Sequence, residues 1–589
     1  MIRTVIVVLI LAGLASPVTA ADSSDSIGRK IDGFTLRDFR GKTHELADFR
    51  DEQIVVVAFL GCECPLAKQY APRLKKLAAE YGPRGVAFLG IDSNSQDTIT
   101  ELGAYARIHE IEFPLLKDPG NIVADQFGAK RTPEVLVLDG DRTIRYQGRI
   151  DDQYVVGRQR SEPTRRDLAA ALDELLAGKP VSVAKTEAPG CHIGRVPTRR
   201  QTGEVTYSNQ IARLLQQRCV ECHRAGEIAP FPLTDYDEVV GWAETMQEVV
   251  HEGRMPPWFA NPEYGKFSND ARLTDEEKRL LDDWIAGGCP EGDPAQLPPP
   301  RQFAVGWQIT QPNQVIYISE EPVTVQAEGT VAYQYYSVDP GFTEDKWIKA
   351  AECRPDNRGV VHHIVAFFIP PGEKLREGLQ RVMVGYAPGM PPVEFDDGVA
   401  MFVPAGSRVV FQMHYTPNGS EQKDRSSMGL VFADPATVKE RVGGGAAANR
   451  FFQIPPGDSN YEVRSHHSFD KDVRLLTLTP HMHLRGKSFR YEAEYPDGTR
   501  EVLLDIPHYD FNWQLRYRLT EPKLLPKGTK LECTAHFDNS ADNLANPDPT
   551  KPVRWGDQTW EEMMIGYFAT LPVEPDVNEP AAPAAGGGE

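Results

Sequence analysis

Two cysteines three positions apart, followed directly by a histidine, stand near the middle of the chain in the segment Cys219-Val220-Glu221-Cys222-His223. This arrangement is typical of covalent haem attachment, in which the Cys219 and Cys222 thiols form thioethers with the porphyrin vinyl groups. His223 is then the expected proximal ligand of the haem iron. The motif predicts a c-type haem, with redox chemistry around it; the alternative is an accidental match in a disulfide-bonded loop.

The other axial ligand of the iron is expected from the loop that follows this motif. Met255 is the best candidate, because the neighbouring Pro256-Pro257 pair holds an extended loop that can present a thioether to the iron. His251 and Met246 are the alternatives. Met246 falls in a helical pattern, which is more typical of a core residue.

The elements that must position the haem are predicted to be helices. A helical pattern over residues 208–217 leads into the motif, and a capping box at Thr274-Asp275-Glu276-Glu277 begins an amphipathic helix that ends at Ala286. This layout predicts an all-α cytochrome c domain over residues 204–297. Residues 181–203, rich in Pro, Gly and Arg, are predicted to be the linker that precedes it.

A second pair of thiols, Cys62 and Cys64, stands where a strand meets a helix. Residues 53–60 are predicted as a buried strand, residues 66–81 as a helix and residues 85–91 as another strand, which together make a βαβ unit. Cys64 lies at the predicted N-terminus of the helix. The partial positive charge there stabilises a thiolate and lowers the pKa of the thiol.

This region, about residues 26–180, resembles the thioredoxin-like redoxin family, in which the first strand delivers a cysteine to a helix N-terminus. The resemblance implies an α/β thioredoxin-like domain with Cys64 as nucleophile and Pro133 as a cis-proline that faces it. Two positions depart from the family pattern. Ala67 occupies the resolving position of a Cys-x-x-Cys motif, and Gly61 stands where a peroxiredoxin has threonine.

The partners of the remaining cysteines are open. Cys62 is a candidate resolving residue for Cys64, in a strained Cys-x-Cys disulfide that would be easily reduced. The alternative is a redoxin scaffold that has lost its thiol chemistry and serves for docking. Cys191 in the linker and Cys289 after the last predicted helix of the haem domain form another hypothetical pair.

Strands dominate the C-terminal half of the sequence. Short alternating runs separated by Pro, Gly and Asn turns predict two β-sandwiches, over residues 303–442 and 449–575, joined by the segment 443–448. The clearest runs are residues 314–319, 331–337, 408–414 and 473–478.

Nine of the 14 histidines fall in this half, which favours a metal site there. Positions two apart on a strand project to the same face, so His481 and His483 can hold one metal ion between them. His362 and His363 would point to opposite faces of a regular strand, so joint ligation requires a bulge or twist. Imidazoles combined with a soft thioether favour copper, with zinc as the alternative. His414, at the end of another strand, completes the set.

These motifs resemble the ascorbate-dependent type II copper monooxygenases, the family of peptidylglycine and dopamine hydroxylating enzymes, over most of residues 305–572. The resemblance implies two jelly-roll subdomains that each bind one copper ion across an open cleft. His362, His363 and His414 match the ligands of the electron-relay copper, and His481, His483 and Met563 match those of the oxygen-activating copper.

Other positions qualify this resemblance. Cys533 matches a cysteine whose family partner falls at Met564, so that disulfide is absent and Cys353 is a substitute candidate. Thr479 replaces the arginine with which peptide-acting members bind a carboxylate, which argues against a glycine-extended peptide as substrate. Outside the two copper sites, the remaining histidines of this half are read as surface or supporting residues: His508, His536 and the pair His466-His467, the last in a polar turn.

The resemblance implies hydroxylation of a C–H bond of a small organic substrate with O2. With a haem fused to the chain, electrons are expected to pass from an external donor through the haem to the copper held by His362, His363 and His414. The main alternative is a periplasmic electron-transfer or copper-handling protein without oxygenase activity. A third is a pair of sandwiches that only bind a partner.

The N-terminal residues indicate where in the cell the protein is located. Residues 1–20 have the pattern of a secretory signal peptide, with Arg3, an apolar run over residues 5–14 and small residues at Val18-Thr19-Ala20. No later apolar run is long enough to span a membrane. The net charge of −20 argues against nucleic acid and anionic membrane surfaces as partners. Together with a haem c, this favours export to a bacterial periplasm; residues 576–589 are predicted to be a disordered tail.

Overall fold

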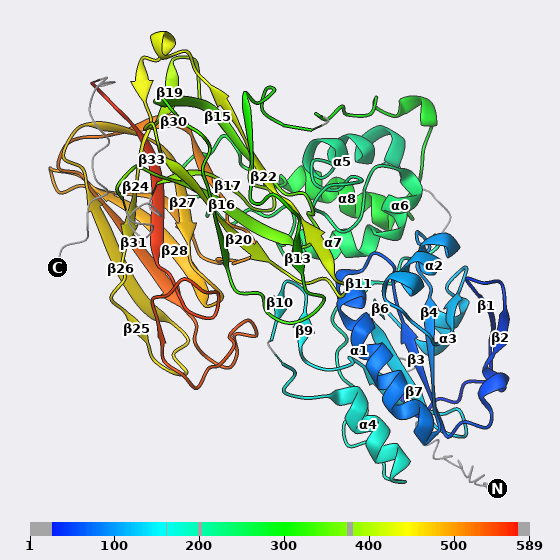
Figure 1. Cartoon of the computed structure of the whole chain (residues 1–589). Coiled ribbons are helices and arrows are strands. Elements are labelled where there is room, and N and C mark those ends of the chain that lie inside the picture. Colours follow the sequence, from blue (N-terminus) through cyan, green and yellow to red (C-terminus); the bar gives the residue numbers. More distant parts are fainter. Residues whose placement is uncertain (1–25, 161, 198–202, 305, 374–380, 575–589) are drawn as a thin grey trace, which may run out of the picture.

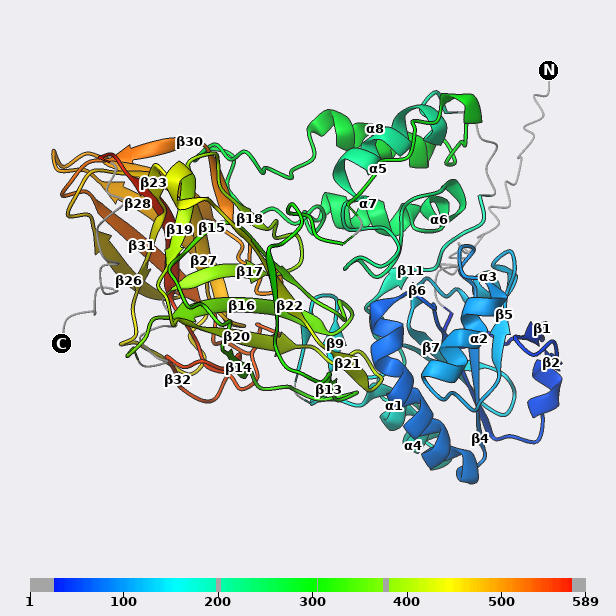
Figure 2. The same ribbon diagram turned by 45° about the horizontal axis from the view of Figure 1, so that its top comes forward.

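The computed structural model describes residues 26–160, 162–197, 203–304, 306–373 and 381–574. The predicted signal peptide and the predicted C-terminal tail lie outside these residues. Figures 1 and 2 show an N-terminal α/β unit, a helical unit and a larger β-rich part, with the helical unit lying against both of the others.

The N-terminal unit is built on a seven-stranded sheet in the order β2-β1-β5-β4-β3-β7-β8. Its strands are β1 (Thr35–Asp38), β2 (Thr43–Glu45), β3 (Ile54–Phe59), β4 (Val86–Asp92), β5 (Leu115–Lys117), β7 (Glu134–Leu138) and β8 (Ile144–Gly148). Its helices are α1 (Pro65–Tyr81), α2 (Ile99–Ile108), α3 (Ile122–Phe127) and α4 (Asp167–Leu176). The parallel pairing of β3 with β4 around α1 confirms the predicted βαβ unit.

Strand β3 is central because both of its faces are buried. Val55, Val57 and Phe59 share a hydrophobic core with α3, whereas Val56 and Ala58, on the other face, share a core with α1, α2 and α4. A strand covered on both faces is apolar along its whole length, which is why residues 54–59 read as a continuous hydrophobic run. The buried strand and the helix that follows it present residues 60–64 at one edge of the sheet.

The segment predicted to be a linker takes part in this unit. Its residues Cys191–His192 form strand β11, which pairs antiparallel with β6 (Arg131–Thr132). A small hairpin, β9 (Tyr154–Val155) with β10 (Arg158–Gln159), lies earlier in the same unit. The linker prediction is therefore corrected at Cys191–His192, because backbone pairing with β6 in a separate two-stranded sheet holds this segment on the N-terminal unit.

The helical unit contains α5 (Ala212–Arg218), α6 (Tyr236–Gly241), α7 (Ala243–His251) and α8 (Asp275–Ala286). The predicted capping box is present, with Thr274 and Glu277 satisfying each other's backbone N–H groups at the start of α8. Trp242 and Trp284 are buried in its core. The loop after α7 leaves this core, since Trp258 packs against Tyr517 of the β-rich part with ring centroids 4.8 Å apart. That loop was predicted to belong wholly to the haem domain.

The first half of the β-rich part packs two main sheets around one core, in the orders β12-β22-β15-β19-β23 and β14-β20-β16-β17. Its strands are β12 (Gln314–Tyr317), β13 (Val323–Val325), β14 (Gln334–Val338), β15 (Lys346–Arg354), β16 (Val361–Ile369), β17 (Val382–Tyr386), β18 (Val393–Glu394), β19 (Val399–Val403), β20 (Arg408–Tyr415), β21 (Gln422–Asp424), β22 (Ser427–Phe432) and β23 (Glu440–Arg441).

The second half has the same two-layered plan, in the orders β24-β33-β27-β30 and β26-β31-β28-β29. Its strands are β24 (Gly443–Ala448), β25 (Gln453–Ile454), β26 (Tyr461–Ser468), β27 (Val473–His481), β28 (Gly486–Glu494), β29 (Arg500–Ile506), β30 (Tyr517–Leu525), β31 (Lys530–Phe537), β32 (Val553–Arg554) and β33 (Ile565–Pro572). The prediction of a β-rich C-terminal half is confirmed.

The expected joint between the two halves is instead the strand β24, which pairs with β33 along its length. Small residues suit this position because the Phe568 ring crosses the strand, so that a Cβ on Gly445 would lie 2.6 Å from Phe568 Cζ. The low side-chain volume of the segment reflects close packing in a sheet rather than a flexible connection.

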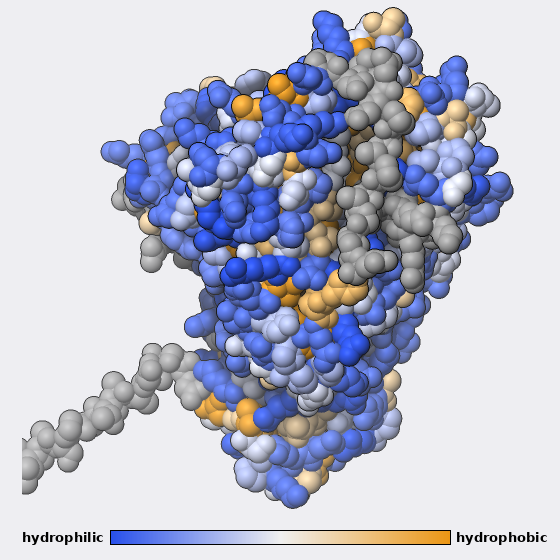
Figure 3. Space-filling model, turned by 90° about the vertical axis from the view of Figure 1, so that its left-hand side faces the viewer, coloured by the Kyte–Doolittle hydropathy of each residue, from blue (hydrophilic) through white to orange (hydrophobic). Residues whose placement is uncertain are grey.

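The face of the β-rich part seen in Figure 3 is predominantly hydrophilic where its residues are coloured. Figure 3 shows its outer face, on which apolar residues occur in small separate groups. Within the described residues, no helix has the length and apolar character needed to cross a membrane.

We expect acid to weaken the packing of the α/β unit on the β-rich part through His109, which is 8% exposed and lies against Gly419. Burial lowers the pKa of His109 from 6.5 to about 4. Between these values the unfolded chain binds a proton that the folded protein does not, so stability present above pH 6.5 is lost as the pH falls toward 4. The loss should reach at most about 3 kcal/mol.

Urea unfolding at several pH values, followed for the parent and His109→Asn, measures this effect. The variant should show a flatter dependence between pH 4 and 6.5 than the parent. The exposed His508 provides the control, because His508→Asn should leave the parent profile unchanged. Equal slopes for the parent and His109→Asn would contradict the prediction.

Candidate thiol, haem and metal sites

Cys64 occupies the N-cap position of α1 and is 1% exposed. Its Sγ donates a hydrogen bond to the backbone carbonyl of Thr132 over 2.9 Å. The Thr132-Pro133 peptide bond is cis, as the resemblance to redoxins implied. The strand–helix junction and the Pro133 loop thus meet at the Cys64 sulfur, which is the arrangement predicted from the sequence.

The thiol next to Cys64 is Cys191. The β6–β11 register places Cys191 opposite Thr132, and the two thiols are hydrogen-bonded to each other. Burial alone would raise the pKa of Cys64, but hydrogen bonding to Cys191 and to the Ala67 backbone N–H stabilises its thiolate and lowers the pKa to about 6. The hydrogen bond to Cys64 and burial together raise the pKa of Cys191.

Cys62, predicted as the resolving residue, faces a different environment. Its Sγ donates to Asp92 Oδ2 over 3.5 Å and its backbone N–H donates to Asp97 Oδ2 over 2.7 Å. Burial and these two carboxylates raise the pKa of the Cys62 thiol, whereas a resolving thiol must ionise to attack. These surroundings disfavour Cys62 as the partner of Cys64, and the Cys62–Cys64 couple stays a prediction.

Sequence reasoning missed the contact between Cys64 and Cys191 and instead paired Cys191 with Cys289. Cys289 is buried in the core of the helical unit, and both cysteines carry free thiols. One local signal for the position of Cys191 beside Thr132 is the preceding residue, Gly190. It has φ +140°, and a Cβ added to it would lie 2.0 Å from the Thr132 carbonyl oxygen. A glycine beside a cysteine can mark a close backbone approach of this kind.

The haem-binding motif forms a tight turn after α5, in which the His223 N–H donates to the Cys219 carbonyl over 2.9 Å. His223 Nδ1 lies 3.0 Å from the carbonyl oxygen of Phe231, whose ring stacks on Trp242 with centroids 3.8 Å apart. A hydrogen bond from Nδ1–H fixes the tautomer and leaves Nε2 free to bind iron. The geometry of Cys219, Cys222 and His223 therefore fits covalent haem.

The three candidates for the other axial ligand differ in their surroundings. His251 is engaged by Asp282, with Nε2 2.8 Å from Oδ1, and its side chain is 54% exposed. Met246 is 6% exposed among the core residues of the helical unit. Met255 is half-buried next to a cis bond to Pro256. These surroundings leave Met255 as the prediction for the sixth ligand.

His362, His363 and His414 come together on the paired strands β16 and β20. The register shifts between Val361 and His363, which is the bulge that joint ligation required. His362 Nδ1 lies 3.3 Å from His363 Nδ1 and 3.2 Å from His414 Nδ1, and one ligand nitrogen of each residue lies within 4.8 Å of the others. Burial lowers the pKa of His362 to about 4 and those of the other two as well, which keeps the imidazoles neutral for metal binding.

His481 and His483 form a second imidazole pair at the end of β27, with ring centroids 5.2 Å apart. Gln514 Oε1 lies 2.9 Å from His481 Nδ1, and His483 Nδ1 lies 3.2 Å from the Glu561 carbonyl oxygen. The His483 Nε2 atom is buried without a hydrogen-bond partner among the described residues. A metal ion would satisfy this nitrogen, so the pair fits a metal site.

Met563 lies two residues before β33, the strand that pairs with β27. His481 is opposite Ile565 in the β27–β33 register, so continuing that register brings Met563 alongside His483. The buried carboxylate of Glu562 accepts the His483 backbone N–H over 2.8 Å and the Arg485 backbone N–H over 2.6 Å. These bonds hold the histidine loop against the segment that carries Met563.

Two aromatic residues lie between the imidazole groups, where the resemblance implied an open cleft. The Tyr333 ring centroid is 4.8 Å from that of His414 and 6.1 Å from that of His483. Phe511 is 5.4 Å from His362 and 6.1 Å from His483. Both aromatic residues are less than 10% exposed. The expectation of an open cleft is corrected, because Tyr333 of the first half and Phe511 of the second fill the space between the imidazole groups.

Several further predictions are corrected by the same packing. Cys533 and Cys353 are buried in the cores of different halves, so they do not pair. The pair His466-His467 belongs to strand β26 rather than to a turn. His508 is exposed, as expected. His536 is half-buried, with Nδ1 3.1 Å from Ser488 Oγ.

The predicted haem site lies against the strand that carries His362 and His363. Glu227, just beyond the haem motif, pairs with Arg358 over 2.7 Å, four positions before His362. The α/β unit also contacts the half that carries the second histidine group, since Asn512 donates to the Gly157 carbonyl over 2.6 Å. The thiol, haem and histidine sites therefore belong to units that contact one another.

Comparison with known proteins concerns the first of these units. Residues 27–147 match the AhpC/TSA family. The thiol-disulfide oxidoreductase ResA of Bacillus cereus is 25% identical over 145 residues, 24% of this chain and 82% of ResA. A putative peroxiredoxin bcp of Haemophilus influenzae is 31% identical over 103 residues, 18% of this chain and 64% of that protein. The crystal structure of a hypothetical protein from Sinorhizobium meliloti is 32% identical, with 29% of this chain and 96% of that chain covered and a TM-score of 0.28.

The N-terminal unit is therefore a thioredoxin-like redoxin domain, as predicted from residues 26–180. The relatives indicate thiol-disulfide oxidoreductase or peroxiredoxin-like redox chemistry, which supports an oxidoreductase role for this domain. The redoxin match ends before the haem motif and the histidine clusters.

Proposed function

We propose that the chain is a periplasmic copper-dependent oxidoreductase that hydroxylates a C–H bond of a small organic molecule with O2, with electrons supplied through a c-type haem. Two buried imidazole groups that face one another across Tyr333 and Phe511 support this function more than any other feature. His362, His363 and His414 would hold one copper ion, and His481, His483 and Met563 the other.

The donor set and its surroundings suit this role. Copper bound by imidazole and thioether ligands supplies one-electron redox chemistry and the activation of O2. Gln514 and the Glu561 carbonyl orient the two histidines of the second group, which keeps one ring nitrogen of each turned toward a common point. Tyr333 and Phe511 exclude water between the groups. Tyr333 is itself held across the two halves, because its N–H donates to Gln558 Oε1 over 2.9 Å.

Hydroxylation places one oxygen atom in the substrate and converts the other to water, so electrons must reach the site from a donor. The haem motif is suitably placed, since Glu227 pairs with Arg358 at the start of the strand that carries His362 and His363. A c-type haem supplies one-electron transfer when bound. Cys219 and Cys222 would hold it covalently, with His223 and Met255 as axial ligands.

Stopped-flow spectroscopy tests the electron route directly. Protein with ferrous haem and Cu(II) is prepared by brief reduction without O2, and haem oxidation is followed at the haem absorption bands. We expect oxidation in the copper-loaded parent and little in copper-free protein or in His414→Ala. Haem oxidation equally slow in all three would refute the route. Incorporation of labelled oxygen from O2 into a product separately tests the hydroxylation.

A second candidate function is electron transfer or copper handling without oxygenase activity. The buried rings of Tyr333 and Phe511 between the imidazole groups favour it, because they occupy the region where the resemblance places an open cleft. Oxygen consumption that is independent of any organic substrate and leaves no hydroxylated product would select this candidate. Thr479 in place of a carboxylate-binding arginine argues against glycine-extended peptides under either function.

A further inference from the structure

Cys64 and Cys191 are brought together by a strand rather than by a shared motif. Strand β11 adds to β6 beside the cis-proline loop, and the register pairs Cys191 with Thr132. Cys64 Sγ contacts the carbonyl oxygen of that same Thr132 at 2.9 Å. Both cysteines also contribute to one hydrophobic core. The two thiols are therefore neighbours in the folded protein although 127 positions separate them in the chain.

Their accessibility differs, and β11 is the reason. Cys64 is 1% exposed at the N-terminus of α1, whereas Cys191 is half-buried at the end of the former linker. A thiol or disulfide in solution can react only with a sulfur atom that it can reach from the solvent. In the folded protein, Cys191 is the more exposed residue of the pair.

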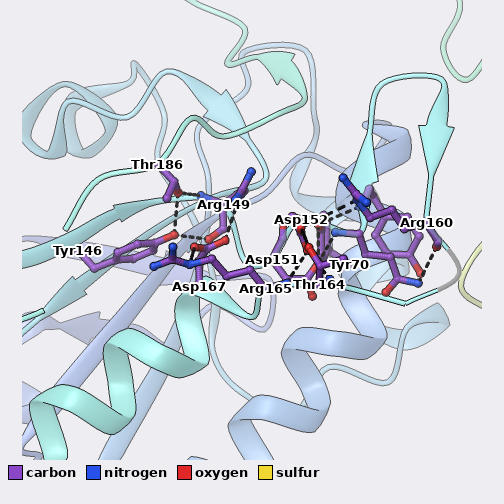
Figure 4. A network of polar contacts seen from close by, with 12 residues as sticks. Tyr70, Tyr146, Arg149, Asp151, Asp152, Arg160, Thr164, Arg165, Asp167 and Thr186 are labelled. Carbon is purple, nitrogen blue, oxygen red and sulfur yellow. Dashed lines mark hydrogen bonds and ion pairs between the residues drawn. The ribbon is translucent and has the colours of Figure 1, made fainter. Parts of the chain in front are cut away.

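The strand that carries Cys191 is fixed at both ends. On one side, Glu248 of α7 accepts from Arg131 Nη2 over 2.6 Å and lies 2.7 Å from His192 Nε2, which holds β6 and β11 together. On the other side, Figure 4 shows Thr186 at the edge of a polar network, with its Oγ1 2.8 Å from the Tyr146 hydroxyl. The position of Cys191 over Cys64 is thus set by backbone pairing and by these anchors.

We infer that Cys64 and Cys191 form one redox-active disulfide, in which Cys191 is the sulfur attacked from solution and Cys64 is the leaving thiolate. A donor thiolate attacks Cys191 Sγ; the Cys191–Cys64 bond breaks, and Cys64 leaves with the electron pair. A second donor thiolate attacks the donor sulfur of the mixed disulfide. This releases Cys191, which takes up a proton, together with one oxidised donor disulfide. Two electrons pass from two donor thiols to the protein.

The environment of each sulfur suits its role. A thiol with a low pKa is the better leaving group in disulfide exchange. Against the effect of burial, hydrogen bonding to Cys191 and to the Ala67 backbone N–H of α1 lowers the pKa of Cys64 to about 6, whereas the pKa of Cys191 is raised. This order of attack reverses that of a Cys-x-x-Cys motif, whose exposed cysteine is the one with the lowered pKa. The inference does not depend on the proposed copper and haem function.

Equilibration of the full-length protein in glutathione redox buffer, followed by acid quenching, thiol alkylation and peptide mass spectrometry, tests this order. Oxidised parent protein should yield a Cys64–Cys191 linked peptide. Cys64→Ser should accumulate glutathione on Cys191. Cys191→Ser should keep Cys64 as a thiol that reacts with oxidised glutathione roughly tenfold or more slowly. Cys289→Ser, a buried thiol of the neighbouring unit, is the matched control and should behave as the parent does.

Opening the strand provides a second readout. Glu248→Gln in the Cys191→Ser background removes the anchor of β11 and should accelerate glutathione attachment to Cys64, provided that circular dichroism shows the fold retained. Rapid attachment of glutathione to Cys64 in Cys191→Ser alone would overturn the order of attack. A Cys62–Cys64 linked peptide in the parent would overturn the pairing itself.

Discussion

Replacing His414 by alanine is expected to lower the copper content from about two ions per protein to about one. His414 supplies one of three imidazoles whose ligand nitrogens lie within 4.8 Å of one another; His363 and His414 are buried and His362 is half-buried. Loss of an outer-shell partner of a metal ligand costs roughly 10- to 100-fold in affinity, so loss of a ligand itself should cost more. The His481–His483 group lies in the other half and should keep its ion.

Metal analysis of periplasmically expressed, haem-loaded protein after dialysis measures this prediction. His481→Ala should give the complementary loss, and the double variant should retain almost no copper. The exposed His508 again provides the control, because His508→Ala should bind as the parent does. Parent protein with no tightly bound copper would remove the basis for the proposed function, leaving a redoxin joined to helical and β-rich units.

Replacing Cys222 by serine is expected to weaken covalent haem attachment, and the Cys219→Ser, Cys222→Ser double variant should lose it completely. The two thiols sit on one turn, with the Cys222 N–H bonded to the Cys219 carbonyl over 3.1 Å, so both can reach the vinyl groups of one porphyrin. Because thioether bonds survive unfolding, haem retained after denaturation reports attachment and not pocket affinity.

Haem staining of denatured protein and intact mass measure the loss. Cys289→Ser is the control, since this thiol is buried in the same unit but outside the motif. Met255→Ala should keep the covalent haem and lose the spectral features of methionine ligation. Haem that stays attached in the double variant would exclude the predicted thioethers, and an unchanged spectrum in Met255→Ala would exclude Met255 as the axial ligand.

Polar contacts join the three structural units close to the thiol, haem and histidine sites. Glu248 joins the strand of Cys191 to the helical unit, Arg358 joins the haem motif to the segment before the strand of His362, and Asn512 joins the redoxin hairpin to the β-rich part. Each contact is a charged or polar bond next to a residue of one site.

What could be predicted from the sequence was local. The haem motif, the capping box at Thr274, Cys64 at a helix N-terminus and the strand pattern around His481 each depend on residues a few positions apart. Short-range spacing determines which side chains share a turn or a face of a strand. Even the bulge at His362-His363 followed from this rule, because two adjacent residues on a regular strand cannot face the same way.

Contacts between distant segments were decided only by the tertiary structure. Cys191 became the neighbour of Cys64 because β11 pairs with β6, and Tyr333 and Phe511 came between the imidazole groups because the two halves pack together. The segment 443–448, read as a joint, became a strand because β33 offered it a pairing edge. The chemistry of a motif can be read from the types of its residues and their spacing. The neighbours that a residue gains through strand pairing and core packing depend on which surfaces of the folded chain meet. A single sequence read in order does not show which surfaces these are.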